Sequence, residues 1–197
     1  LSWPGPGGQK WIYLFNGTTL SKIADPNTPI PGGSGNFTNF IEPVISGSNV
    51  AFAGVWSSGE WGIYLFNGTT LSKVADRNTP IPGGSGNFQG FSPPVISGSN
   101  VAFAGNGASG QNGIYLFNGT TLSKIADHNT PIPDGSGNFQ FLSKPVISGG
   151  NVVFEGYHGS SGQLGFYLSD GTTLRKVFDL NTPIPGGSGN FTNFIEP

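Results

Sequence analysis

The sequence predicts an all-β protein in which short antiparallel strands are built from a repeated unit. Three observations predict this fold class. The 197 residues include 34 glycines and 16 prolines, both of which disfavour helices. Apolar runs alternate with turn-forming residues along the whole chain. One apolar run recurs with a nearly constant spacing, and a period of about 50 residues is typical of propellers, solenoids and modular arrays.

The recurring run defines the repeat. It reads Ile-Tyr-Leu-Phe at 12–15, 63–66 and 114–117, and Phe-Tyr-Leu-Ser at 166–169, with offsets of 51, 51 and 52 residues. We therefore treat residues 1–197 as a single repeat domain, with units at approximately 1–43, 44–94, 95–145 and 146–197.

Each unit contains two predicted strand pairs. The runs at 63–66 and 69–74 flank Asn67-Gly68, which is a strong hairpin signal. The runs at 94–97 and 101–104 flank a Gly-Ser-Asn turn. Several of these strands are apolar at successive positions, which predicts that both faces of each sheet are covered by neighbouring units.

Four antiparallel strands in about 50 residues, covered on both faces, match one blade of a β-propeller. We predict a β-propeller of about four four-stranded blades, with 51-residue repeats and one blade incomplete. A β-solenoid and an open array of repeats are the alternatives.

The strand runs at 94–97, 101–103, 114–116 and 122–127 resemble the blade of TolB-like propellers. The usual Ser-Pro-Asp-Gly turn of that blade is replaced here by Ser-Gly-Ser-Asn, or by Ser-Gly-Gly-Asn at 148–151. The near-identical units also resemble the tandem repeats of exported bacterial surface proteins. That second resemblance implies an extracellular or cell-surface location and no catalytic activity.

The incomplete blade follows from the two ends of the sequence. Residues 190–197 repeat residues 36–43, and alignment of the repeats places Leu1 opposite Phe52. The array could continue, the ring could close with the first residues as a substitute edge, or another copy could supply the missing strands. The third outcome would produce a homo-oligomer or filament. We expect its edge to comprise Leu1, Ser2, Trp3, Phe194, Ile195 and Pro197.

A second repeated segment joins each blade to the next, beginning at Asp25, Asp76, Asp127 and Asp179. Its Asp-x-Asn start contains oxygen ligands suited to calcium, but the remaining ligands of a standard calcium loop are absent. We favour an Asx turn followed by a proline-stiffened connection, with Phe88 and Phe91 as an aromatic plug beneath it. The sequence predicts no metal site and no cofactor.

The connection before each Ile-Tyr-Leu-Phe run is the most variable part of the unit. In a propeller it shares one rim with the Asp-x-Asn segments. Aromatic rings there could bind a glycan or a protein partner, or they could instead plug the blade interfaces. The candidate ligand-binding residues are Trp3, Trp11, Trp56, Trp61, Tyr157 and His158.

Composition excludes several other functions. The chain has 8 Lys+Arg and 10 Asp+Glu, so there is no electrostatic case for nucleic acid or an anionic membrane. It has no cysteine, and its two histidines, His128 and His158, lie in different units without nearby nucleophiles or metal ligands. We therefore predict no enzyme. We expect a non-catalytic extracellular structural or adhesive repeat protein that self-associates, with a carbohydrate-binding propeller lectin as the alternative.

Overall fold

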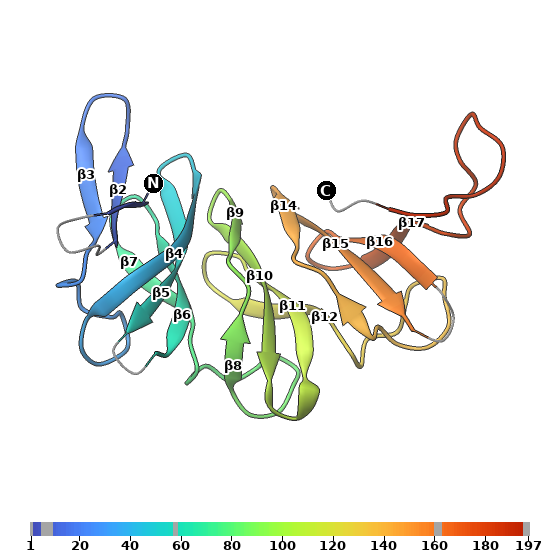
Figure 1. The fold of residues 1–197 in the computed structure, drawn as a ribbon, viewed down its shortest axis with the longest axis horizontal. Helices are drawn as coiled ribbons and strands as arrows, with labels where there is room; N and C mark the ends of the chain where they lie inside the picture. The colour runs from blue at the N-terminus through green and yellow to red at the C-terminus, as the bar shows by residue number, and fades with distance from the viewer. Residues whose placement is uncertain (1, 5–9, 57–58, 160–162, 195–197) are drawn as a thin grey trace.

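The computed structural model describes residues 2–4, 10–56, 59–159 and 163–194, and Figure 1 shows its four antiparallel sheets following one another along the chain. The described residues contain no α-helix, and therefore no helix long and apolar enough to cross a membrane. A 3-10 turn lies at Ala108–Gly110. The prediction of an all-β fold is confirmed.

The first sheet has three strands and the others are meanders of four or five. The first comprises β1 (Ser2–Pro4), β2 (Lys10–Phe15) and β3 (Leu20–Ala24). The second comprises β4 (Phe37–Ser46), β5 (Asn49–Trp56), β6 (Trp61–Phe66) and β7 (Leu71–Ala75). The third comprises β8 (Phe88–Phe91), β9 (Val95–Ser97), β10 (Asn100–Gly107), β11 (Asn112–Phe117) and β12 (Leu122–Asp127). The fourth comprises β13 (Phe141–Leu142), β14 (Val146–Ser148), β15 (Asn151–His158), β16 (Gln163–Ser169) and β17 (Leu174–Asp179).

The predicted hairpins are present. In the β6–β7 hairpin, Phe66 pairs with Leu71, and Gly68 adopts a left-handed φ of 92°. The Oδ1 atom of Asn67 accepts hydrogen bonds from the backbone amides of Thr69 and Thr70 at 3.1 and 2.8 Å. Because these amides bond to the asparagine side chain, the second strand begins at Leu71 rather than at the predicted residue 69.

The first strand of each later sheet is longer or more interrupted than predicted. In the third sheet, β8 and β9 both pair with β10, whereas the sequence analysis assigned Phe88–Phe91 to the connection. Pro93 and Pro94 separate the two segments and have no backbone N–H to donate to the ladder. In the second sheet the two segments form one strand, β4, with a register shift between Ile41 and Val44. The unit boundary at 43/44 therefore lies within β4, and the boundary at 94/95 lies immediately before β9.

The described part of the first sheet has fewer strands than the other sheets, as the repeat alignment predicts. Ser2 of β1 pairs with Ile12, and Ala53 of β5 pairs with Ile63 at the equivalent place in the second sheet. β1 thus corresponds to the end of β5, as the repeat alignment predicts. Among the described residues the first sheet has no counterpart of β4.

The hydrophobic core lies between the sheets. Three clusters of buried side chains join the first sheet to the second, the second to the third, and the third to the fourth. At the middle boundary, Ile63 and Val74 pack with Phe88, Phe103 and Tyr115 of the next sheet. Neighbouring sheets therefore cover each other's faces, which is the arrangement of a propeller-like fold.

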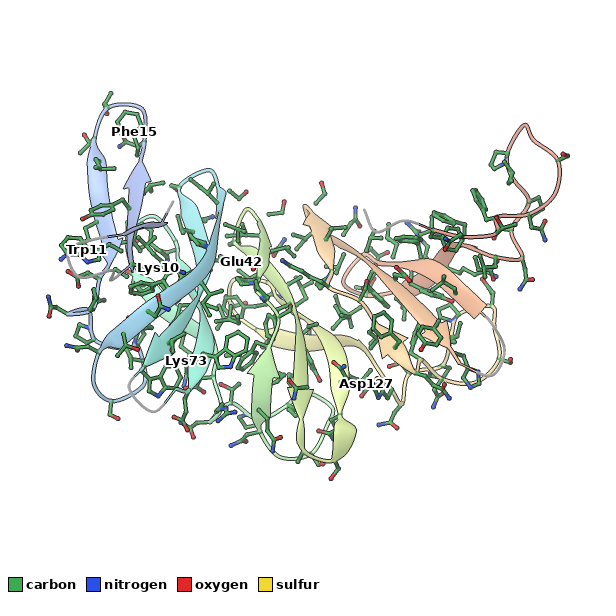
Figure 2. The ribbon with its side chains drawn as sticks, in the orientation of Figure 1. Lys10, Trp11, Phe15, Glu42, Lys73 and Asp127 are labelled. Carbon is green, nitrogen blue, oxygen red and sulfur yellow. The ribbon has the colours of Figure 1, made fainter. Side chains whose placement is uncertain are left out.

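Polar clamps hold adjacent turns together at one edge of the sheets. The amide of Gly98 donates to Oγ of Ser46, and Nδ2 of Asn49 donates to the carbonyl of Gly98, both at 2.8 Å. Ser97, Asn100 and Gly149 repeat this clamp one boundary later, also at 2.8 Å. Lys144 forms an ion pair with Glu42 at 3.3 Å, linking the fourth sheet to the second (Glu42 is labelled in Figure 2). The opening strands of these three sheets therefore converge.

Candidate functional site

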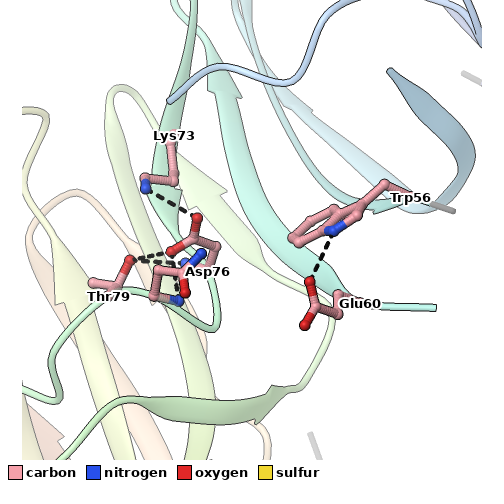
Figure 3. A network of polar contacts seen from close by, with 6 residues as sticks. Trp56, Glu60, Lys73, Asp76 and Thr79 are labelled. Atoms are coloured by element: carbon pink, nitrogen blue, oxygen red, sulfur yellow. Dashed lines mark hydrogen bonds and ion pairs between the residues drawn. The ribbon is translucent and has the colours of Figure 1, made fainter. Parts of the chain in front are cut away.

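The repeated aspartates form a closed hydrogen-bonding network. Oδ1 of Asp76 accepts from the Asn78 amide at 3.0 Å and from Oγ1 of Thr79 at 2.8 Å. Its Oδ2 accepts from Nζ of Lys73 at 2.9 Å (Figure 3). The same three contacts recur around Asp25, Asp127 and Asp179. Both carboxylate oxygens are already occupied, which supports the Asx-turn interpretation over a calcium site.

The charge state of these aspartates fits that structural role. The hydrogen bond from Lys22 is the main cause that lowers the pKa of Asp25 below 3.8. For Asp127 and Asp179, burial alone would raise the pKa, but hydrogen bonds from the neighbouring lysine and threonine lower it below the ordinary value. The ion pairs are therefore intact at neutral pH. No group of three or more His, Cys, Asp and Glu side chains in the described part of the chain is placed to hold a metal ion.

One tyrosine per sheet lies buried near each of the later aspartates. Burial, with a smaller contribution from the aspartate charge, raises the pKa of Tyr115 and Tyr167 to about 12 and that of Tyr64 still further. These phenols therefore stay protonated at neutral pH. The hydroxyls of Tyr64 and Tyr167 are buried and have no hydrogen-bond partner among the described residues. Their rings act as core side chains.

Two equivalent cavities lie on the rim, one repeat apart. The first, of about 500 Å³, is lined by Arg77, Asn87, Phe88, Gln89 and Ala108. The second, of about 430 Å³, is lined by His128, Gly137, Asn138, Phe139, Gln140 and His158. Each combines the Asp-x-Asn segment that follows one sheet with the variable connection of the next sheet. The structure thus brings together the two segments that the sequence analysis placed on one rim.

The two cavities differ in some of their lining residues. Nε of Arg77 donates to the carbonyl of Gln89 at 2.9 Å, whereas His128 occupies the equivalent position in the second cavity. His158 lies against Gly137, where a Cβ atom would come within 2.9 Å of its Nε2. The sequence alone indicates no relationship between the two histidines. Their shared cavity arises because the loop after the third sheet runs beside the fourth.

The predicted tryptophans lie at the first two sheets. The ring of Trp61 is nearly perpendicular to that of Phe91 across the boundary, with centroids 5.8 Å apart. Trp56 is half-buried, and its Nε1 donates to Oε2 of Glu60 at 3.0 Å (Figure 3). Trp11 is half-buried beside Tyr13, with centroids 5.9 Å apart. Trp3 is paired with Trp11 in the β1–β2 ladder.

The six candidate ligand-binding residues lie on three different sheets. Tyr157 and His158 belong to β15 of the fourth sheet, whereas the tryptophans belong to strands of the first two sheets. The structure instead pairs Tyr157 with Phe141, a residue that the sequence analysis did not select. Their ring centroids are 5.5 Å apart, the rings are tilted by 34°, and the residues are 38% and 41% exposed. The sequence signal for this pair is Phe141 itself, an aromatic residue at the position where the third unit has Gly90.

The predicted assembly edge is only partly described. Leu1, Ile195 and Pro197 lie outside the described residues, and Ser2 and Trp3 form part of β1. Phe194 packs within its own molecule, with ring centroids 5.5 Å from Phe166 and 5.0 Å from Phe178.

The fold and rim define a propeller-like all-β repeat protein. The chain belongs to the DUF7453 family, described as a family of unknown function, whose sequence model matches residues 4–100 and 61–197. Among solved structures it is similar to a putative TolB from Agrobacterium tumefaciens, with 17% identity and a TM-score of 0.43. The similarity covers 91% of this chain and 60% of that TolB chain, so this chain spans well under the full length of its structural neighbour. No curated protein matches the sequence.

Proposed function

We propose that this chain is a non-catalytic structural or adhesive repeat protein of the cell exterior that associates with further copies of itself. The observation that carries the proposal is the exposure of apolar side chains on two end faces. We call the face of the first sheet with Phe15 and Leu20 the leading face. We call the surface at the fourth sheet with Val177 and Ile184 the trailing face.

The leading face exposes residues whose counterparts pack at internal boundaries. Phe15 and Leu20 are 61% and 65% exposed, and Figure 2 labels Phe15 in the first hairpin. Their counterparts in the second sheet, Phe66 and Leu71, are partly buried against the core that joins the first two sheets. Phe117 of the third sheet packs in the same way.

The trailing face shows the same contrast. Val177 and Ile184 are 50% and 37% exposed, whereas their counterparts Val74 and Ile81 are 6% and 5% exposed. Full burial of one such side chain stabilises a contact by about 1.5–3 kcal/mol. Covering both faces would therefore favour association.

The leading and trailing faces correspond to the two sheet surfaces that pack against each other at the internal boundaries. Each internal boundary joins the trailing side of one sheet to the leading side of the next. A head-to-tail contact between copies would repeat that packing and extend without closing, which produces a filament. Strand addition beside the three-stranded first sheet is the accompanying contact that the incomplete blade favours.

The absence of catalysis and the exterior location are supported separately. The polar residues repeated in every unit are engaged in turns and ion pairs that fix the connections. The resemblance to exported tandem repeats supports the location. Protease treatment of intact source cells should degrade the protein, and complete protection would contradict an exterior location.

The assembly proposal is tested by light scattering during gel filtration over a range of protein concentrations. We expect the mass of the wild-type chain to grow with concentration and the double variant Phe15→Asp/Leu20→Asp to remain monomeric. Ser21→Asp/Ser34→Asp adds the same charge at exposed polar positions and should assemble like the wild type. A wild-type monomer at every concentration, or a double variant that assembles normally, would contradict the proposal.

A further inference from the structure

We infer that Phe141 and Tyr157 form a carbohydrate-binding platform that stacks on the apolar face of a neutral sugar ring. This site is separate from the end-face contact proposed above. It rests on the geometry of the two rings, on their restriction to one sheet and on their polar surroundings.

The geometry brings two exposed rings into contact on one sheet. Phe141 and Tyr157 are directly opposite each other in the β13–β15 ladder. Their centroids lie 5.5 Å apart, and both residues remain more than one-third exposed. Exposed aromatic pairs provide a large apolar contact area, and the tyrosine adds a polar tip.

The fold does not require this pair. The equivalent positions hold Gly90 and Asn106 in the third sheet, where Gly90 is likewise paired with Asn106. In the second sheet they hold Asn39 and Val55, which are also ladder partners. Sheets with the same topology thus form without aromatic rings there, so the fourth sheet carries a specific addition.

The exposure of the pair does not depend on a missing neighbour. Asn106, the counterpart of Tyr157, is exposed although the fourth sheet packs beyond its own sheet. Phe194 follows the fourth sheet in the sequence and is the repeat counterpart of Phe91, whose ring contacts that of Trp61. It packs on Phe166 and Phe178 and leaves Tyr157 exposed.

The surroundings favour a sugar over an ionic ligand. Gln140 and His158 are the chain neighbours of the two rings and line the adjacent 430 Å³ cavity with Asn138. Oε1 of Gln140 accepts from the Gly159 amide at 2.8 Å, which holds this amide group at the rim. A sugar ring combines an apolar face of C–H groups with peripheral hydroxyls, which matches aromatic rings whose chain neighbours carry amide and imidazole groups. The cavity lining contains no Lys, Arg, Asp or Glu side chain among the described residues, which favours a neutral sugar.

The test is affinity electrophoresis of the purified chain in gels containing soluble β-1,3-glucan, β-1,4-xylan or galactomannan. We expect one of these polysaccharides to retard the wild-type chain. The double variant Phe141→Gly/Tyr157→Asn takes the residues of the third sheet, which the fold already accommodates, and should weaken binding at least about tenfold. Ile45→Ser removes an exposed apolar side chain elsewhere, outside the two end faces, and should leave binding unchanged.

A converse variant tests sufficiency. Gly90→Phe/Asn106→Tyr transfers the pair to the third sheet and should raise the number of binding sites per chain from one to two. Thermal melting of each variant separates loss of the rings from loss of the fold, and Tyr157→Asn alone replaces Phe141→Gly/Tyr157→Asn if that variant melts early. Failure of all three polysaccharides to retard the chain would overturn the inference. Undiminished binding by a folded variant without the rings, or selective binding of a proline-rich peptide, would also overturn it.

Discussion

The boundary between the second and third sheets and the boundary between the third and fourth share their packing but differ at the rim. In the core at the first of these boundaries, Phe88 meets Tyr115 of its own sheet edge-on with centroids 4.9 Å apart and an angle of 86°. Phe139 meets Tyr167 at 4.8 Å and 87°, which is nearly the same arrangement. At the rim, by contrast, Arg77 is replaced by His128.

This difference shows which positions the fold constrains. Buried aromatic positions must fill one shape at each boundary, because a packed interior has no room for change. Rim positions face solvent and can hold a cation, an imidazole or an aromatic ring on the same backbone. Binding specificity can therefore vary from blade to blade while the packing stays constant.

The most direct way to break this comparison is to remove one matched packing ring from each boundary. Phe88→Ala and Phe139→Ala should each lower the free energy of unfolding by about 3–5 kcal/mol, because both side chains are only 1% exposed. Urea unfolding would measure both losses. Exposed Phe141→Ala is the control and should change stability by less than about 0.5 kcal/mol. If one boundary tolerated the change while the other did not, the packing would not be equivalent.

The repeated ion-pair network should have the next largest effect. Asp76→Ala removes the acceptor for Lys73, Asn78 and Thr79 and should destabilise the chain by about 2 kcal/mol. Asp170→Asn retains a turn residue found in the other units and should have little effect on unfolding in urea. Equal stability of Asp76→Ala and the wild type would argue against the structural role of the network.

Acid should reveal the same network without mutation. Because the folded pKa values of Asp25, Asp127 and Asp179 are below 3.8, their contribution is complete above the unfolded pKa. It is lost as pH falls through the folded pKa values. We expect similar urea midpoints at pH 7 and 5 and a lower midpoint below about pH 4. A midpoint that rises on acidification would contradict these shifts.

The smallest predicted effect concerns one residue that differs among the four repeated connections between sheets. Asp134 stands where the other three connections have glycine, and its φ is 54°, in the left-handed region. Asp134→Gly should relieve this strain and stabilise the chain by up to about 1 kcal/mol. Thermal melting would measure the change. Gly83→Asp at the equivalent position should have the opposite effect, and a gain in stability there would contradict the strain argument.

The sequence alone predicted the parts of this fold that depend on local chemistry. The hairpin around Asn67-Gly68 and the turn at Asp76 are encoded by side chains that bond to their own backbone. The repeat then predicted the number of blades and the incomplete one. Strand β8 was missed because a Gly-rich connection precedes it and two prolines follow it, so its pairing with β10 is a tertiary effect.

The candidate sites were less predictable because they need contacts between distant segments. His128 and His158 are 30 residues apart in the sequence, yet they line one cavity. Phe141 shares its residue type with the plug residue Phe91, although only Phe91 is buried, and residue type alone does not separate the two. The alternation of buried and exposed positions along a short irregular strand was the missing information.

The solvent exposure of the two end faces, measured as protein concentration rises, tests most directly whether the sheets of neighbouring copies cover one another. Hydroxyl-radical footprinting should be performed at a low and a high protein concentration. We predict that Phe15, Leu20, Val177 and Ile184 are labelled at low concentration and protected at high concentration. Their buried counterparts Val74 and Ile81 should stay protected in both conditions. Equal labelling of the end faces at both concentrations would contradict the account.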